Sequence, residues 1–202
     1  MTREAPPSST VFPTMRVRAA GVAFVVSVLA CAAQASPAWA YSVIGPWWSD
    51  PDITYNASTV RDRTAALYAA RVWNRSGIGV RLRRTNGPGD VVVQSTGPGC
   101  GGIAILGRRR PQVLLGRCSL ALAKLVATHE FGHVLGFRHE RSRCALMNVS
   151  MDRRGTPARC DRRPMAFWLA DPLRADDVLG ARALARLRYG TYRRAARTAE
   201  SP

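Results

Sequence analysis

The three histidines of this chain all fall in one short segment, with the spacing of a metal site. His129 and His133 are four residues apart, so on a helix both imidazoles project from one face and can bind one ion. Glu130 follows the first of them and can reach a water molecule beside the ion without being a ligand. Gly136 can end the helix in the left-handed conformation, which would return the chain and bring in His139 as a third ligand. Three protein ligands leave a fourth position open, so the segment predicts a zinc site of the catalytic type.

An ordinary structural role is the alternative for these histidines, and their distribution argues against it. Core or surface histidines would be spread along the chain, whereas all three of this chain lie within the segment. We therefore expect one Zn²⁺ ion as the cofactor, bound by His129, His133 and His139.

A long helix must present these ligands, and both of its ends are marked in the sequence. Ser119 can cap its start, and Gly136 stops it after Leu135. Before this helix, apolar alternation and short apolar runs bounded by turn residues predict a sheet. The expected strands are Ile53–Asn56, Gly79–Arg84, Asp90–Gln94, Ile103–Leu106 and Val113–Leu115.

Two further helices are expected around the sheet. One runs from Val60 to about Arg75, capped by Ser58 or Thr59; the residues available for its buried face are Val60, Leu67, Val72 and Trp73. The last runs from Ala175 to about Tyr189, after a polar loop rich in arginine. The fold class is α+β, with a mixed twisted sheet, flanking helices and a mainly helical C-terminal part.

Residues 1–40 have the features of a secretory signal peptide, so we expect a secreted, extracellular protein. Met15–Arg18 is basic, Ala19–Ala30 is an apolar run too short for a transmembrane span, and an A-x-A site ends at Ala40. Cleavage there would leave one folded domain over 41–192 and a polar, mobile tail over 193–202. Met15 is an alternative start to Met1. A lipid anchor through Cys31, at an imperfect lipoprotein box, is the alternative to release.

The cysteines agree with export. Without Cys31 four remain, an even number that predicts two disulfides in an oxidising compartment. Three pairings are possible, and we prefer the one that is local in sequence, Cys100–Cys118 with Cys144–Cys160.

The charge is strongly positive, with 30 Lys+Arg against 13 Asp+Glu and a formal net charge of +17. Lys124 is the single lysine, and such an arginine bias can reflect a GC-rich genome. A nucleic-acid partner is the rival interpretation. It would rest on runs such as Arg108–Arg110 and Arg162–Arg163, which are scattered through predicted loops and match no known binding motif, so no nucleic acid is expected.

The histidine segment matches H-E-x-x-H-x-x-G-x-x-H, the signature of metzincin metalloproteases. Among these the chain resembles the matrixins. Leu125–Gly136 is similar to the matrixin active-site helix and Cys144–Asn148 to the Met-turn, with Met147 beneath the zinc. Ala175–Leu184 resembles the closing helix of that family and Ile53–Tyr55 its opening strand.

The chain also departs from the matrixin pattern. Nothing like a cysteine-switch propeptide stands between Ala40 and Ile53, and no histidine precedes His129. Asp90 is the single carboxylate between Asp62 and Glu130, too few for calcium sites, so calcium and a structural zinc are not expected. His139–Glu140 resembles the astacins, although Asn148 stands where astacins carry a tyrosine after the Met-turn.

The resemblance implies that 41–192 is a metalloprotease catalytic domain, an endopeptidase that acts on protein or peptide substrates. Glu130 would be the general base, and the domain is expected to be a monomer. The resemblance also places the edge strand that pairs with substrate at Ile103 and Ala104, and Leu125 in the pocket for the side chain after the scissile bond. An ordinary sheet strand and a core leucine are the alternatives for these residues. A catalytically silent zinc-binding or adhesion module on the same fold is the alternative. Against it stands Glu130, which zinc binding does not require.

Overall fold

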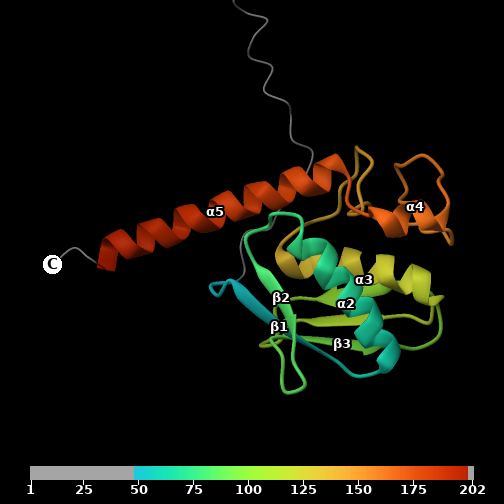
Figure 1. The fold of residues 1–202 in the computed structure, drawn as a ribbon, viewed down its shortest axis with the longest axis horizontal. Coiled ribbons are helices and arrows are strands. Elements are labelled where there is room, and N and C mark those ends of the chain that lie inside the picture. Colours follow the sequence, from blue (N-terminus) through green and yellow to red (C-terminus); the bar gives the residue numbers. More distant parts are fainter. Residues whose placement is uncertain (1–47, 200–202) are drawn as a thin grey trace, which may run out of the picture. The chain divides into compact units, whose positions relative to one another are not determined.

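A five-stranded mixed sheet carries the elements that hold the candidate site (Figure 1). The computed structural model describes residues 48–199, which belong to the unit of the chain from Trp39 to Pro202. The expected signal peptide, 1–40, with Cys31, lies outside the described residues. The strands are β1 (Asp52–Ala57), β2 (Arg81–Arg84), β3 (Val91–Ser95), β4 (Gly102–Ile105) and β5 (Gln112–Leu115). Each expected strand is present, with small differences at its ends.

The strands lie in the order β2-β1-β3-β5-β4, and β4 is the antiparallel edge strand. The other neighbours run parallel. Burial alternates along β1, where Ile53, Tyr55 and Ala57 are buried and Thr54 and Asn56 between them are not. Successive side chains of a strand point to opposite faces, so one face of the sheet packs on the core.

Two helices cover that face, and their ends agree with the sequence prediction (Figure 1). α2 (Val60–Asn74) begins after Thr59, whose hydroxyl accepts a hydrogen bond from the backbone N–H of Asp62 at 3.0 Å. α3 (Leu120–Leu135) begins after Ser119 and ends at Gly136, whose φ of 108° lies in the left-handed region.

The buried face of α2 differs from the prediction. Val72 and Trp73 are buried, but Val60 is 69% exposed and Leu67 is 40% exposed. The buried face consists instead mainly of small residues, Ala65, Ala66, Ala69 and Ala70. These alanines let α2 lie close to α3, and the indole N–H of Trp73 donates a hydrogen bond to the carbonyl oxygen of Thr128 at 2.7 Å. The prediction failed because it ranked side chains by size, whereas the close helix contact selects small ones.

The C-terminal part contains one helix that the sequence did not predict and one that is longer than expected. α4 (Met165–Ala170) lies in the segment that was expected to be a polar loop. The helix was missed because its apolar run is short and is flanked by arginines. α5 (Ala175–Ala199) does not end near Tyr189, so 193–199, which the sequence analysis expected to be a polar tail, is helical. Alanine and arginine are good helix formers, which accounts for the extension. None of the helices among the described residues combines the length and apolar character needed to cross a membrane.

Candidate metal centre

α3 and the loop that follows it bring the three histidines together. His129 and His133 lie one turn apart on α3, and the chain reversal at Gly136 places His139 against them. The Nε2 atom of His133 lies 3.1 Å from that of His129 and 3.1 Å from that of His139. In the part of the chain that the structure describes, this is the one cluster of three potential metal ligands.

Backbone carbonyl groups hold the other ring nitrogens of the first two ligands. Nδ1 of His129 lies 2.8 Å from the carbonyl oxygen of Leu146, and Nδ1 of His133 lies 2.9 Å from that of Phe137. Burial lowers the pKa of His129 to about 3 and also lowers the pKa of His133, so both rings are neutral at pH 7. Their single protons therefore sit on Nδ1, where they are donated, and each Nε2 presents a lone pair.

This donor set fits zinc. Two bare Nε2 lone pairs cannot hydrogen-bond to each other, so their close approach calls for a cation between them. Two nitrogens at about 2.0–2.1 Å from one tetrahedral zinc ion lie roughly 3.3 Å apart, near the observed 3.1 Å. Neutral imidazoles whose Nδ1–H groups are held by carbonyl oxygens are typical zinc ligands.

Glu130 lies beside the histidines in a buried position, where its side chain is enclosed by α3 and β4. The residue is 5% exposed, and burial raises the pKa of its carboxyl group to about 7, against the opposing effect of a hydrogen bond with the backbone of Ala104. A Cβ atom at Gly102 would lie 2.6 Å from Cγ of Glu130, so β4 passes directly over this side chain. A carboxyl group with this pKa can accept and release a proton near neutral pH.

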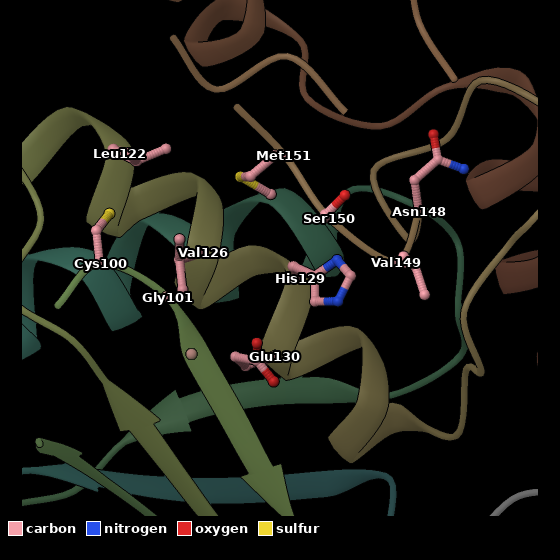
Figure 2. A pocket seen from close by; sticks show the side chains of 11 residues that line it. Cys100, Gly101, Leu122, Val126, His129, Glu130, Asn148, Val149, Ser150 and Met151 are labelled. Carbon is pink, nitrogen blue, oxygen red and sulfur yellow. The ribbon is translucent and has the colours of Figure 1, made fainter. Parts of the chain in front are cut away.

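A cleft opens beside His129 and Glu130 (Figure 2). Leu122 and Val126 of α3 line it, together with the segment after the Met-turn. Leu125 is not among the residues that line this cleft; it is fully buried and lies against Gly155, which agrees with the alternative of a core role. The cleft follows the face of α3 between His129 and Glu130, and Leu125 lies on the far side of His129 from it.

The edge strand β4 lies along the same site. Ile103 is 60% exposed. Ala104 is half-buried, and its backbone forms a hydrogen bond with the carboxyl group of Glu130. In the described sheet β4 has a neighbour on one side, β5, where Ile103 pairs with Leu114. The position is compatible with the expected pairing to an extended substrate.

Met147 lies beneath α3, as the resemblance to the Met-turn implied. It is 2% exposed, and a Cβ atom at Gly132 of α3 would collide with its sulfur atom. The carbonyl oxygen of Met147 accepts a hydrogen bond from the backbone N–H of Glu140 at 2.8 Å. This bond joins the Met-turn to the loop that carries His139.

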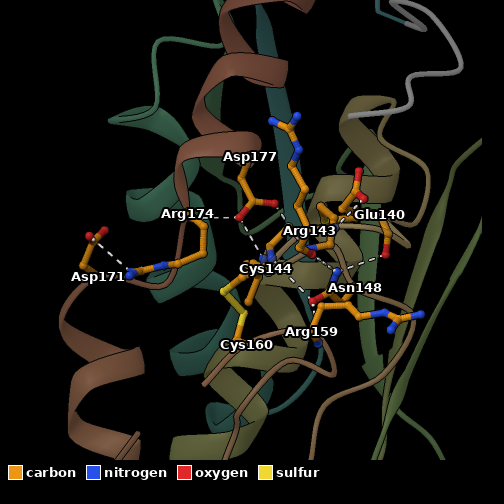
Figure 3. The surroundings of a disulfide bond; sticks show 12 residues. Glu140, Arg143, Cys144, Asn148, Arg159, Cys160, Asp171, Arg174 and Asp177 are labelled. Carbon is orange, nitrogen blue, oxygen red and sulfur yellow. Dashed lines mark hydrogen bonds and ion pairs between the residues drawn. A yellow bond between two sulfur atoms is a disulfide. The ribbon is translucent and has the colours of Figure 1, made fainter. Parts of the chain in front are cut away.

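Asp177 of α5 secures the Met-turn, a role that the sequence analysis missed (Figure 3). Its carboxylate accepts hydrogen bonds from the backbone N–H groups of Leu146 at 2.7 Å and Met147 at 3.2 Å, and from that of Arg174 at 2.8 Å. Because Nδ1 of His129 lies 2.8 Å from the carbonyl oxygen of Leu146, Asp177 is linked through one residue to a candidate metal ligand. The acidic pair that opens α5 was the available signal, but it indicated only a favourable helix terminus.

Asn148 closes the loop between the third histidine and the Met-turn (Figure 3). Its Nδ2 donates to the carbonyl oxygens of Glu140 at 3.0 Å and Arg143 at 2.8 Å, and its Oδ1 accepts from the backbone N–H of Arg159 at 3.1 Å. The residue is 1% exposed. At the position where astacins carry a tyrosine, this chain therefore has a side chain committed to loop structure.

Two disulfides flank the centre, in the local pairing preferred from the sequence. Cys100–Cys118 joins the segment before β4 to the segment before α3. Cys144–Cys160 joins the start of the Met-turn to the chain that returns past Asn148 (Figure 3).

Comparison with known proteins gives one family match. The family model described as Astacin, a peptidase family, matches residues 42–149, a span that includes all three histidines, Glu130 and Met147. No curated protein matches the chain. The match confirms the metzincin assignment in its astacin form and does not confirm the matrixin-like type.

Proposed function

Because this chain belongs to the astacin family of peptidases, we propose that it is a secreted endopeptidase that hydrolyses peptide bonds with Glu130 as general base. The observation that carries the proposal is the convergence of three histidine Nε2 atoms beside the buried carboxyl group of Glu130. The matrixin likeness of Ala175–Leu184 lies beyond the matched residues and stays a proposal for the closing helix alone.

The residues divide the work of peptide hydrolysis among them. A bound zinc ion supplies Lewis acidity, which lowers the pKa of water and polarises a carbonyl group. Glu130 accepts a proton from the attacking water and passes it to the nitrogen that leaves when the peptide bond breaks. The pKa of Glu130 would fall below its metal-free value if the histidines held a dication, since a nearby positive charge favours the charged carboxylate. The backbone carbonyls of Leu146 and Phe137 keep the first two ligands in the required tautomer.

Secretion is supported by the signal-like segment and the two disulfides. Both disulfides join segments that hold the candidate site, so an oxidising compartment, in which these bonds persist, stabilises the folded site. We propose release from the cell after cleavage at Ala40, with protein or peptide substrates and a monomeric domain.

The substitution Glu130→Gln tests the proposal, because it removes the proton acceptor and leaves the ligands intact. We expect this variant to bind one zinc ion per chain and to lose hydrolysis of an unfolded protein such as casein. The exposed Asp161 provides the control: Asp161→Asn removes the same charge and should keep both properties. Casein turnover by Glu130→Gln at the wild-type rate would exclude Glu130 as the general base.

A further inference from the structure

The turn between β4 and β5 carries three consecutive arginines, Arg108–Arg110, which we call the basic tip. Ile105 pairs with Gln112, so the two strands form an antiparallel hairpin and the basic tip lies at its end. All three arginines are exposed. The sequence has no aspartate or glutamate between Asp90 and Glu130, a stretch that includes β3, β4, β5 and the basic tip. The charged side chains of the hairpin are therefore all positive.

The charge of the basic tip is largely unneutralised within the chain. Arg108 donates a hydrogen bond to the amide oxygen of Gln112 at 3.5 Å, which leaves the charge of its guanidinium in place. Asp90 lies near Arg110, but its carboxylate accepts hydrogen bonds from the backbone N–H of Thr54 at 2.8 Å and from its hydroxyl at 2.6 Å. Among the residues that the structure describes, no carboxylate forms an ion pair with the basic tip. A carboxylate of another molecule can therefore form charge-assisted hydrogen bonds there.

The basic tip continues the strand that passes over the proposed general base. β4 begins at Gly102, directly above Glu130, and the backbone of Ala104 forms a hydrogen bond with the carboxyl group of Glu130. In the described sheet β4 has no neighbour on its outer side, so its backbone groups there can pair with an extended substrate. Arg108 follows Ala104 by four positions, which is at most about 13 Å at about 3.3 Å per residue. A substrate cleaved at Glu130 therefore reaches the basic tip about three to five residues from the scissile bond.

The direction of pairing determines which side of the substrate meets the basic tip. Antiparallel pairing is the more stable and the more frequent arrangement of neighbouring strands. β4 runs from Gly102, beside Glu130, toward the basic tip, so an antiparallel substrate has its N-terminal part at the basic tip. We infer that the basic tip selects substrates with an acidic residue about three to five positions before the scissile bond. The inference rests on the proposed function, because the cleaved bond defines these positions.

Cleavage of a peptide library of known sequences by the zinc-loaded protein tests the inference, with the cleaved bonds located by mass spectrometry. We expect aspartate and glutamate to be enriched about three to five positions before the cleaved bond. For one well-cleaved peptide, kcat/KM should be about fivefold higher with glutamate than with glutamine at the enriched position, the upper range for an exposed ion pair. Raising NaCl from about 0.05 M to about 0.5 M should bring this ratio close to unity, because salt screens exposed charges.

Two variants that lose the same charge separate the basic tip from the general positive charge of the chain. Arg108→Ser with Arg109→Ser removes two charges of the basic tip and should lower the glutamate-to-glutamine ratio to below about twofold. Arg71→Ser with Arg75→Ser is the matched control, because both arginines are exposed. Arg71 lies near Tyr55 of β1, and β3 and β5 separate β1 from β4. The control should keep the wild-type ratio.

Equal kcat/KM for the two peptides, an acidic preference confined to positions after the cleaved bond, or a preference that survives in the tip variant would overturn the inference. A loss of preference in both variants would assign it to the net charge instead. Binding of two fluorescent peptides, one with a run of glutamates and one with a run of glutamines, separates this inference from the proposed function. Tighter binding of the glutamate peptide that depends on the basic tip, without cleavage of any peptide, would refute the peptidase function alone. Cleavage without an acidic preference would refute the role of the basic tip alone, and neither cleavage nor selective binding would refute both.

Discussion

Gly102 of β4 allows a direct test of how closely the edge strand must approach Glu130, the proposed general base. A Cβ atom at this position would lie 2.6 Å from Cγ of Glu130 and 2.6 Å from Cγ1 of Val126. Ordinary van der Waals contact begins at 3.4 Å, so in Gly102→Ala the two side chains or the strand must move by about 0.8 Å. The side chain of Glu130 is the most flexible of these groups, and we expect it to be displaced from the metal centre.

The expected effect falls more on activity than on stability. A misplacement of about 1 Å at a reacting group costs about 10²-fold in rate, so kcat/KM for a fluorogenic peptide should fall by about that factor. The free energy of unfolding in urea should fall by about 1–3 kcal/mol, the usual cost of overpacking. Gly97→Ala is the control in the same glycine-rich segment, because a Cβ atom there meets nothing within 4 Å. A Gly102→Ala protein with wild-type kcat/KM would show that β4 does not constrain Glu130.

Two further predictions concern the supports of the site. Burial raises the pKa of Asp177 to about 6, above the ordinary value of about 3.9, so the folded chain binds more protons than the unfolded chain between these values. The free energy of unfolding of the wild type, measured relative to Asp177→Asn, should therefore fall by about 2 kcal/mol as the pH rises from about 4 to about 7; a difference that stays constant with pH would contradict the assignment. Cys144→Ser with Cys160→Ser removes a cross-link with a sequence separation of 16 and should lower the urea-derived free energy of unfolding by about 3 kcal/mol, whereas a loss below about 1 kcal/mol would show that the bond adds little.

The histidine cluster of the candidate metal centre could be predicted from the sequence because its signals are local. The spacing of His129 and His133 fixes their common helix face, and Gly136 marks the reversal that His139 requires. Ser119 likewise marks the start of α3. Each of these features depends on residues within a few positions of one another, so the rest of the fold was not needed to find them.

The supports of the centre depend on contacts between distant residues and could not be predicted. Asp177 reaches Leu146 across 31 positions, and Trp73 reaches Thr128 across 55. Leu122 and Leu125 lie on different sides of α3, but the sequence does not tell which side meets the cleft and which meets the segment around Gly155. Local periodicity gives the faces of a helix but not the element that each face meets.

Restoration of activity by zinc tests the central claim most directly. The wild-type protein is freed of metal with a chelator, zinc is added back in known amounts, and casein hydrolysis is measured at each addition. We predict that hydrolysis is absent without metal, rises in proportion to added zinc and reaches its plateau at one ion per chain. Full hydrolysis by the metal-free protein would contradict the assignment of His129, His133 and His139 as the ligands of a catalytic zinc ion.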